Sequence, residues 1–242
     1  MSDMLLSVTA LSKKFGGFAA LSDLSLMVRR GERLGIIGPN GSGKTTLINC
    51  ICGLLRNDAG TIVFDGANIT SLAPHQRTRL GVARSFQIPR PFASMTLAEN
   101  LAVPLEYVTH RRSLHTVDVR GEALAILEQM GLRDKADISS IALTQIDLRK
   151  LELARALAAR PRLLILDEAM AGLSSLEVDE ILEILFALNN RGITIIMVEH
   201  IMRAIMRFSQ RVVCLDAGCL IADGAPEHIV ANPDVRRVYL GA

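Results

Sequence analysis

A strand, a glycine-rich loop and a helix follow one another in residues 33–49, which read RLGIIGPNGSGKTTLIN, and this stretch constrains the fold most. Residues 38–45 match the pattern G-x-x-x-x-G-K-[ST]. Glycines let the backbone fold tightly around an anion, and the N–H groups at the start of the helix point toward it. The alternative is a glycine-rich turn that merely carries Lys-Thr. The apolar strand before the loop and the helix after it favour phosphate binding instead.

This loop predicts a role for each of its polar groups. Lys44 would bring a full positive charge to the β- and γ-phosphates, the Thr45 hydroxyl would ligate Mg²⁺, and Thr46 would reach the α-phosphate side. The residues expected to contact the bound phosphates and their base are Gly38, Pro39, Asn40, Gly41, Ser42, Gly43, Lys44, Thr45 and Thr46.

A second candidate element is LLILDE at 163–168, where four apolar residues precede two carboxylates. The apolar run predicts a buried central strand, and ligands bind at the carboxyl ends of parallel strands. Asp167 is placed to orient Mg²⁺ through its water shell, and Glu168 to polarise an attacking water. A strand that ends in solvated acids is the alternative; the phosphate-binding loop makes it the less favoured one.

Short apolar strands alternate with helical patterns along the chain, which indicates an α/β domain with a largely parallel sheet. We expect one domain over 1–242, a small antiparallel β portion in the first quarter, and an inserted helical subdomain at about 88–160. Expected strands are 5–9, 24–28, 33–37, 61–64, 81–86, 163–166, 194–198, 211–215 and 219–222. Expected helices in the inserted segment are 97–103, 117–130 and 148–159.

Composition excludes several other classes. Lys plus Arg is 27 and Asp plus Glu is 25, and this balance argues against a dedicated nucleic-acid binder. The longest stretch without a charged residue is 11 positions, far short of the roughly 20 apolar residues that a membrane-spanning helix needs. The N-terminus shows no signal-peptide pattern. The four cysteines are expected to be small buried residues in a reducing compartment.

With these two motifs in place, the sequence resembles the ATP-binding subunit of an ABC transporter, and most of all those of bacterial branched-chain amino acid importers. The run GAPEHIVANPDVRRVYLGA at the C-terminus resembles the ending of that subfamily. The resemblance implies ATP and Mg²⁺ as cofactors, and a peripheral position on the cytoplasmic face of the inner (plasma) membrane. It also implies transmembrane permease subunits, a second ATPase subunit and, indirectly, a periplasmic substrate-binding protein as partners, and no nucleic acid.

Three further residues match the family in order. Phe15 is similar to the aromatic residue that stacks on adenine, with Phe18 as the weaker candidate; a strand-end core residue is the alternative. Gln87 is similar to the glutamine that contacts Mg²⁺ and the attacking water, and the following IPRPFASMT is similar to the stretch that faces the membrane subunit. His200 is similar to the switch histidine that contacts the γ-phosphate, rather than an ordinary surface histidine.

The family signature Leu-Ser-Gly-Gly-Gln is altered here to LTQID at 143–147. Thr144 keeps a hydroxyl for a partner's nucleotide, Gln145 and Ile146 replace the glycines, and Asp147 is expected to be the N-cap of a helix that begins near Leu148. In the family, one subunit's signature completes the other subunit's site. The hypothesis is a heterodimer with one competent and one weakened site. A homodimer with two weakened sites, or a variant signature that works, are the alternatives.

Two other functions stay open. A non-transport ABC protein in DNA repair or translation usually carries long coiled coils or two ATPase units, for which this chain has no room. An ATP sensor with weak hydrolysis is kept open by the altered signature. On the helix after the signature, Arg149, Lys150 and Arg155 are expected to form a solvated face, with pairing to Glu152.

Overall fold

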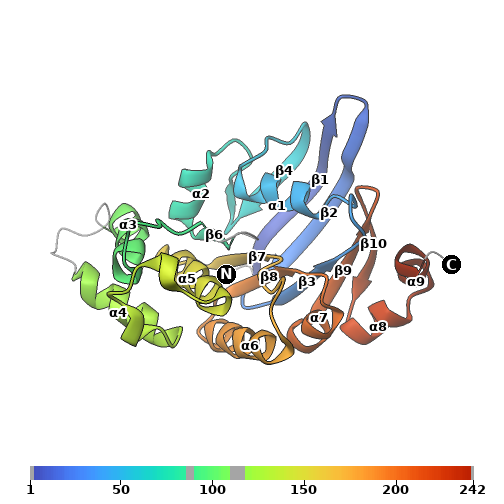
Figure 1. The fold of residues 1–242 in the computed structure, drawn as a ribbon. Coiled ribbons are helices and arrows are strands. Elements are labelled where there is room, and N and C mark those ends of the chain that lie inside the picture. The colour runs from blue at the N-terminus through green and yellow to red at the C-terminus, as the bar shows by residue number, and fades with distance from the viewer. Residues whose placement is uncertain (1–2, 86–89, 110–117, 241–242) are drawn as a thin grey trace.

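The computed structural model describes residues 3–85, 90–109 and 118–240 (Figure 1). Its strands are β1 (Met4–Phe15), β2 (Phe18–Arg29), β3 (Arg33–Ile37), β4 (Ala59–Phe64), β5 (Ala67–Asn68), β6 (Val82–Ser85), β7 (Leu163–Asp167), β8 (Thr194–Val198), β9 (Arg211–Asp216) and β10 (Cys219–Gly224). Its helices are α1 (Lys44–Cys52), α2 (Pro74–Leu80), α3 (Leu97–Thr109), α4 (Val119–Gln129), α5 (Gln145–Ala158), α6 (Ser175–Asn190), α7 (Met202–Phe208), α8 (Pro226–Ala231) and α9 (Pro233–Leu240).

The larger sheet has six strands in the order β10-β9-β3-β8-β7-β6. All of its neighbouring pairs are parallel except β10 with β9, so the predicted parallel-rich α/β fold is confirmed. Strands β3 and β8 coincide with the predicted ranges, and β7 is one residue longer because it includes Asp167. Since β3 and β7 both pair with β8 in the same direction, the segments that follow them emerge at one edge of the sheet.

The smaller sheet is antiparallel, with four strands in the order β2-β1-β4-β5, which confirms the predicted antiparallel portion. Strands β1 and β2 run to 12 residues each, well beyond the short apolar runs that the sequence suggested. The pairing continues because register shifts, one of them between Val8 and Leu11, absorb the break in alternation. Ala10, inside that shift, has a φ of +52°.

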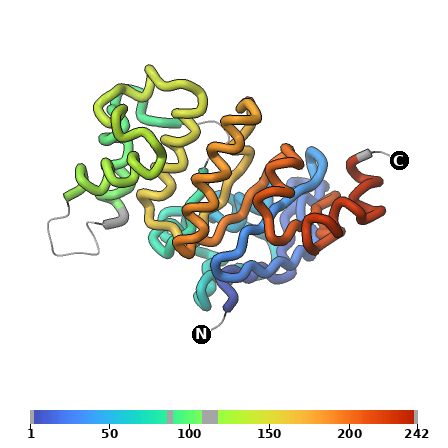
Figure 2. Tube along the Cα trace, turned by 90° about the horizontal axis from the view of Figure 1, so that it is seen from below, coloured from blue at the N-terminus to red at the C-terminus, as the bar shows by residue number. Residues whose placement is uncertain are grey.

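Two hydrophobic cores lie on the two faces of the parallel sheet. One is between this sheet and the antiparallel sheet, with α1 packed there through buried Leu47, Ile48 and Ile51. The other is between the parallel sheet and the helices α5, α6 and α7. These helices lie below the sheet in Figure 1, and Figure 2, which is seen from below, shows them side by side. The near-continuous apolar runs of β7 and β8 follow from burial on both faces.

The segment predicted to be helical contains α3, α4 and α5 (green to yellow in Figure 1). Helix α3 continues to Thr109, six residues past its predicted end, although Pro104 lies inside it. In α4, Leu127 is buried, whereas Glu128 is exposed and paired with Arg133.

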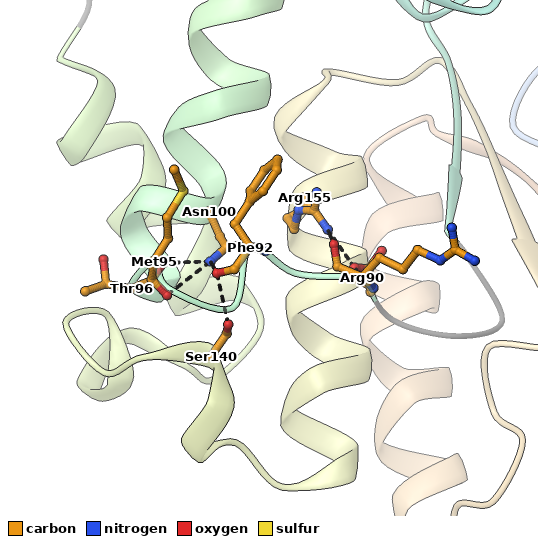
Figure 3. A network of polar contacts seen from close by, with 8 residues as sticks. Arg90, Phe92, Met95, Thr96, Asn100, Ser140 and Arg155 are labelled. Atoms are coloured by element: carbon orange, nitrogen blue, oxygen red, sulfur yellow. Dashed lines mark hydrogen bonds and ion pairs between the residues drawn. The ribbon is translucent and has the colours of Figure 1, made fainter.

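A network of polar contacts fixes the chain just before α3 (Figure 3). The Asn100 side chain is fully buried; its Nδ2 donates to the carbonyls of Phe92, Met95 and Thr96 at 3.1, 3.3 and 2.9 Å. Its Oδ1 accepts the Phe92 N–H at 2.8 Å. Upstream, the Arg90 N–H donates to Glu152 Oε1 at 2.9 Å, and its carbonyl accepts from Arg155 at 2.8 Å. Residues 90–96 are therefore held against α3 and α5.

All four cysteines are free, and three are buried as predicted, but Cys219 is exposed because it starts the edge strand β10. Within the described residues, no helix combines the length and the apolar character that crossing a membrane requires.

Candidate active site

The glycine-rich loop connects the end of β3 at Ile37 to the start of α1 at Lys44, in the context that the motif predicts. Two of its glycines have no room for a side chain. A Cβ at Gly38 would lie 2.3 Å from the Leu215 carbonyl oxygen, and one at Gly43 would lie 2.6 Å from that of Ala20. Gly43 is also the N-cap of α1, with a φ of +103° and no side chain to cap the first turn. The N–H groups of that turn are therefore directed at a site for an anion.

Lys44 lies inside this loop with only 6% of its surface exposed. Its Nζ donates to the carbonyl oxygens of Gly38 at 2.7 Å and Pro39 at 2.9 Å. Burial lowers the pKa of the Lys44 ammonium, and the charges of Glu168 and Asp167 act in the opposite direction. The ammonium is held in place before any phosphate arrives.

The two predicted carboxylates follow β7 at the same edge. Asp167, the last residue of β7, is 5% exposed, and its Oδ2 forms an ion pair with Arg84 of β6. Arg84 also donates to Asn49 Oδ1 of α1 at 2.6 Å, so it links the acidic strand to the helix that follows the loop. This arrangement fixes the position of Asp167.

Glu168 turns sharply out of β7. Its φ is +51°, a left-handed value that is uncommon outside glycine, and its N–H donates to the Val198 carbonyl at 2.8 Å. Its Oε1 lies 2.8 Å from His200 Nε2. The two predicted catalytic side chains, which are 32 positions apart, are therefore in direct contact.

Most of the residues predicted to bind the nucleotide line one cavity of about 230 Å³. Its lining consists of Phe15, Phe18, Ala20, Asn40, Gly41, Ser42, Gly43, Lys44, Thr45, Thr46, Glu168 and His200. The rings of Phe15 and Phe18 are 48% and 60% exposed, which argues against a core role for Phe15 and leaves both available for stacking on a base. Gln87 lies outside the described residues, and Thr144 is not part of this cavity.

The altered signature forms the first turn of α5. The N-cap is Thr144, whose Oγ1 accepts the Asp147 N–H at 3.3 Å, so the prediction that Asp147 is the N-cap is wrong. The helix begins at Gln145, three residues earlier than expected, because Thr144 supplies the cap. Asp147 is buried and pairs with Lys135 at 2.6 Å. Burial opposes its ionisation, but the hydrogen bonds from Lys135 and Thr144 lower its pKa.

The helix after the signature is not the solvated face that we expected. Arg149 and Lys150 are 8% and 6% exposed. Arg149 donates to the Ala171 carbonyl at 3.0 Å, and Lys150 pairs with Glu180 of α6. Only the expected pairing of Arg155 with Glu152, at 2.7 Å, is confirmed. The two cationic groups point inward because they bind oxygen acceptors on neighbouring elements: the Arg149 guanidinium a carbonyl of the 169–173 loop, and the Lys150 ammonium a carboxylate of α6.

Glu199 is a residue that sequence reasoning missed. It is 2% exposed, and its Oε1 accepts the Met170 N–H at 2.8 Å. Burial raises the pKa of its carboxyl to about 7. The hydrogen bond from the Met170 N–H opposes this rise, the nearby charge of Glu168 adds to it, and Arg149 opposes it more weakly. The sequence signal was a carboxylate directly after the apolar strand 194–198. Glu199 joins the loop that follows Glu168 to the segment that carries His200.

The parallel sheet, the loop and this cavity define a nucleotide-binding cassette. A family model described as "ABC transporter" matches residues 21–171, and one described as "Branched-chain amino acid ATP-binding cassette transporter" matches residues 219–242. The high-affinity branched-chain amino acid transport ATP-binding protein LivG of Salmonella typhimurium is 38% identical over 100% of this chain and 99% of its own.

Solved structures agree with these matches. An ATP-binding cassette of an ABC transporter in its ADP conformation is 30% identical, with a TM-score of 0.89 over 100% of both chains. A dimeric cassette in a post-hydrolysis state with ADP and Pi is 26% identical, with a TM-score of 0.82 over 92% of this chain and 99% of that chain. The chain belongs to the ABC transporter family, and it is an ATPase.

Glu199 predicts a pH dependence of stability. The unfolded carboxyl ionises near its ordinary pKa of 4.5, whereas the folded one keeps its proton to about pH 7. The protonated carboxyl therefore contributes to the free energy of unfolding at low pH, and this contribution is lost as the pH rises from 4.5 through 7. The loss is on the order of 3 kcal/mol. Glu199→Gln stays neutral and still offers Oε1 to Met170. The stability of this variant relative to the native chain should increase between pH 5 and pH 8.

Thermal unfolding at the two pH values measures this difference. Glu183→Gln is the matched control, because Glu183 is an exposed α6 carboxylate paired with Arg207, and its relative stability should change little with pH. Equal shifts for the two variants at pH 5 and pH 8 would contradict the raised pKa.

Proposed function

We propose that this ATPase powers an importer for branched-chain amino acids or related small polar solutes. The observation that carries the ATPase part is the meeting of Lys44, Glu168 and His200 around one cavity. The substrate class rests on the C-terminal match to the branched-chain family model and on relatives named for that transport. An ATPase of another transport system, or a sensor with weak hydrolysis, is the alternative.

The chemistry follows from the positions of the side chains. Phosphoryl transfer depends mainly on positioning and on electrostatic stabilisation of the transferred group. Lys44 and the N–H groups of the first turn of α1 would hold the β- and γ-phosphates, while Phe15 would stack on the adenine. Glu168 would orient and polarise the attacking water. His200 would hold the Glu168 carboxylate and contact the γ-phosphate.

A magnesium ion fits the oxygen donors at the start of α1 and at the end of β7. Mg²⁺ prefers a few hard oxygen ligands together with waters and substrate phosphates. Thr45 offers a hydroxyl in the cavity lining, and Asp167 offers a carboxylate fixed by Arg84. Among the described residues no cluster of three or more His, Cys, Asp or Glu could hold a metal ion. The ion would neutralise phosphate charge, and Gln87 would be a further ligand.

Replacing Glu168 tests the catalytic assignment. Glu168→Gln keeps the shape and the hydrogen bond to His200 but removes the base. ATP binding should persist, while phosphate release falls at least about 100-fold and amino acid uptake stops in vesicles that contain the whole transporter. Binding by calorimetry, phosphate release and uptake of labelled leucine are the measurements. Glu183→Gln should behave as the native chain, and hydrolysis at the native rate by Glu168→Gln would overturn the assignment.

An apolar groove supports the docking of a permease. A cavity of about 360 Å³ opens between α2, β6, α3 and α5. Its lining includes Leu54, Pro74, Val103, Pro104 and Ala156. Val103 and Leu54 are 40% and 50% exposed, which is suited to cover by a short helix of a membrane subunit. Arg155 and Glu152 also line it and hydrogen-bond to the backbone of Arg90, in the stretch that resembles the family's membrane-facing segment.

A charge in this groove should break the docking. Val103→Asp is expected to reduce co-purification with the membrane subunits at least about tenfold, because docking would remove water from a charged carboxylate in a largely apolar groove, while ATP binding stays unchanged. Val230→Asp is the matched control, since Val230 is 44% exposed on α8, off the groove. Equal recovery of both variants with the membrane subunits would exclude the groove as the docking site.

The chain would act at the cytoplasmic face of the inner membrane with a second ATPase subunit, and indirectly with a periplasmic substrate-binding protein. Thr144 and Gln145 are exposed at the start of α5, whereas Ile146 packs on the core and Asp147 is paired inward. Thr144 and Gln145 are thus the signature residues presented to a partner's nucleotide. The proposed assembly is a heterodimer in which this signature completes the weaker site, with a homodimer as the alternative.

Removing the Gln145 side chain tests this weakness. Gln145→Gly should raise turnover several-fold, because glycine allows closer backbone approach to the partner's γ-phosphate. Steady-state ATPase assays of the assembled transporter measure the effect. The matched control is Ala142→Gly, an exposed position just before the signature. Unchanged turnover in Gln145→Gly would mean that the altered signature is not limiting.

A further inference from the structure

The last helix of the chain contacts the first residue of the phosphate-binding loop. The Tyr239 hydroxyl of α9 accepts the backbone N–H of Gly38 at 2.6 Å, across 201 positions of sequence. Gly38 follows directly on β3 and begins the motif. The segment that carries Tyr239 lies outside the part of the chain that matches the general ABC model, 21–171, and inside the part that matches the branched-chain model, 219–242.

Gly38 is restrained at its N–H, at its carbonyl oxygen and at its Cα. Its carbonyl oxygen accepts from Lys44 Nζ at 2.7 Å, and its Cα is so close to the Leu215 carbonyl that a Cβ would lie 2.3 Å from that oxygen. The Tyr239 hydroxyl occupies the N–H side. One residue therefore joins the C-terminal helix, the end of β9 and the lysine that would hold the phosphates.

Helix α9 is held in place by an N-terminal cap and by a buried side chain, so it can restrain the position of Gly38 through Tyr239. Asn232 Oδ1 accepts the N–H groups of Asp234 and Val235 at 2.8 and 3.3 Å and so caps its first turn. Val235 is 5% exposed and belongs to the core cluster that contains Ile229 of α8. Burial raises the pKa of the Tyr239 hydroxyl to about 12, so the group is a neutral phenol at physiological pH.

We propose that Tyr239 is a positioning residue for the phosphate-binding loop: through Gly38 it holds the loop, and with it Lys44, in the geometry that retains ATP. The C-terminal helix is then part of the nucleotide site, and a ligand or partner that moves α9 would change the affinity for ATP. This inference rests on the proposed binding of ATP by the loop.

Tyr239→Phe removes one oxygen atom and tests the proposal. Loss of the hydrogen bond should raise both the dissociation constant for ATP and the KM for ATP about fivefold. This factor corresponds to about 1 kcal/mol of binding free energy. We expect kcat and the thermal unfolding temperature to stay at native values. The Gly38 amide should also exchange its hydrogen faster, a readout that does not depend on turnover.

Arg237→Ala is the control on the same helix, because Arg237 is exposed and pairs with Asp234 three positions before it. It should leave KM and Gly38 exchange unchanged. The inference is overturned if Tyr239→Phe binds ATP as tightly as the native chain. It is equally overturned if weaker binding comes with matching losses of kcat and thermal stability, which would indicate general unfolding. If the native chain itself binds no ATP, the proposed function fails first.

Discussion

The parallel pairing of β3, β8 and β7 is the constraint on which the site depends. It brings the loop that ends in Lys44 and the acidic pair Asp167–Glu168 to one edge of the sheet, although 123 positions separate Lys44 from Asp167. Both strands are buried on two faces, so neither can slip without exposing apolar residues or breaking the ladder. The geometry for phosphate chemistry is therefore a consequence of core packing.

Buried charged residues next to the cavity hold in place the segments that the parallel sheet brings to one edge. Arg84 joins Asp167 to α1, and Glu199 joins the loop after Glu168 to the segment of His200. Arg149 donates to the carbonyl of Ala171 in that same loop, so the helix of the altered signature contacts the loop that follows Glu168. Such groups are costly to bury alone, so each has an ionic or hydrogen-bonding partner, and these contacts hold the walls of the cavity in place.

Sequence reasoning succeeded where a local pattern carries its own geometry. The glycine-rich loop, the strands with continuous apolar runs, and His200 at a strand end were each predicted and found in place. It failed at the start of α5, where Asp147 looked like a cap but pairs with Lys135, 12 positions earlier. It failed also for Arg149 and Lys150, whose inward direction depends on α6 and the 169–173 loop, elements that no helical period reveals.

The amino-acid sequence by itself predicted the groups available for phosphate chemistry. These are a glycine-rich loop that lets the backbone approach an anion, one lysine, and two carboxylates and a histidine that follow strands. Those assignments follow from local steric and charge rules that act over a few residues. Which distant groups meet was settled by folding, as with Glu168 against His200 and Tyr239 against Gly38. Contacts across 32 and 201 positions depend on how sheets and helices pack, and packing leaves no periodic trace in the sequence.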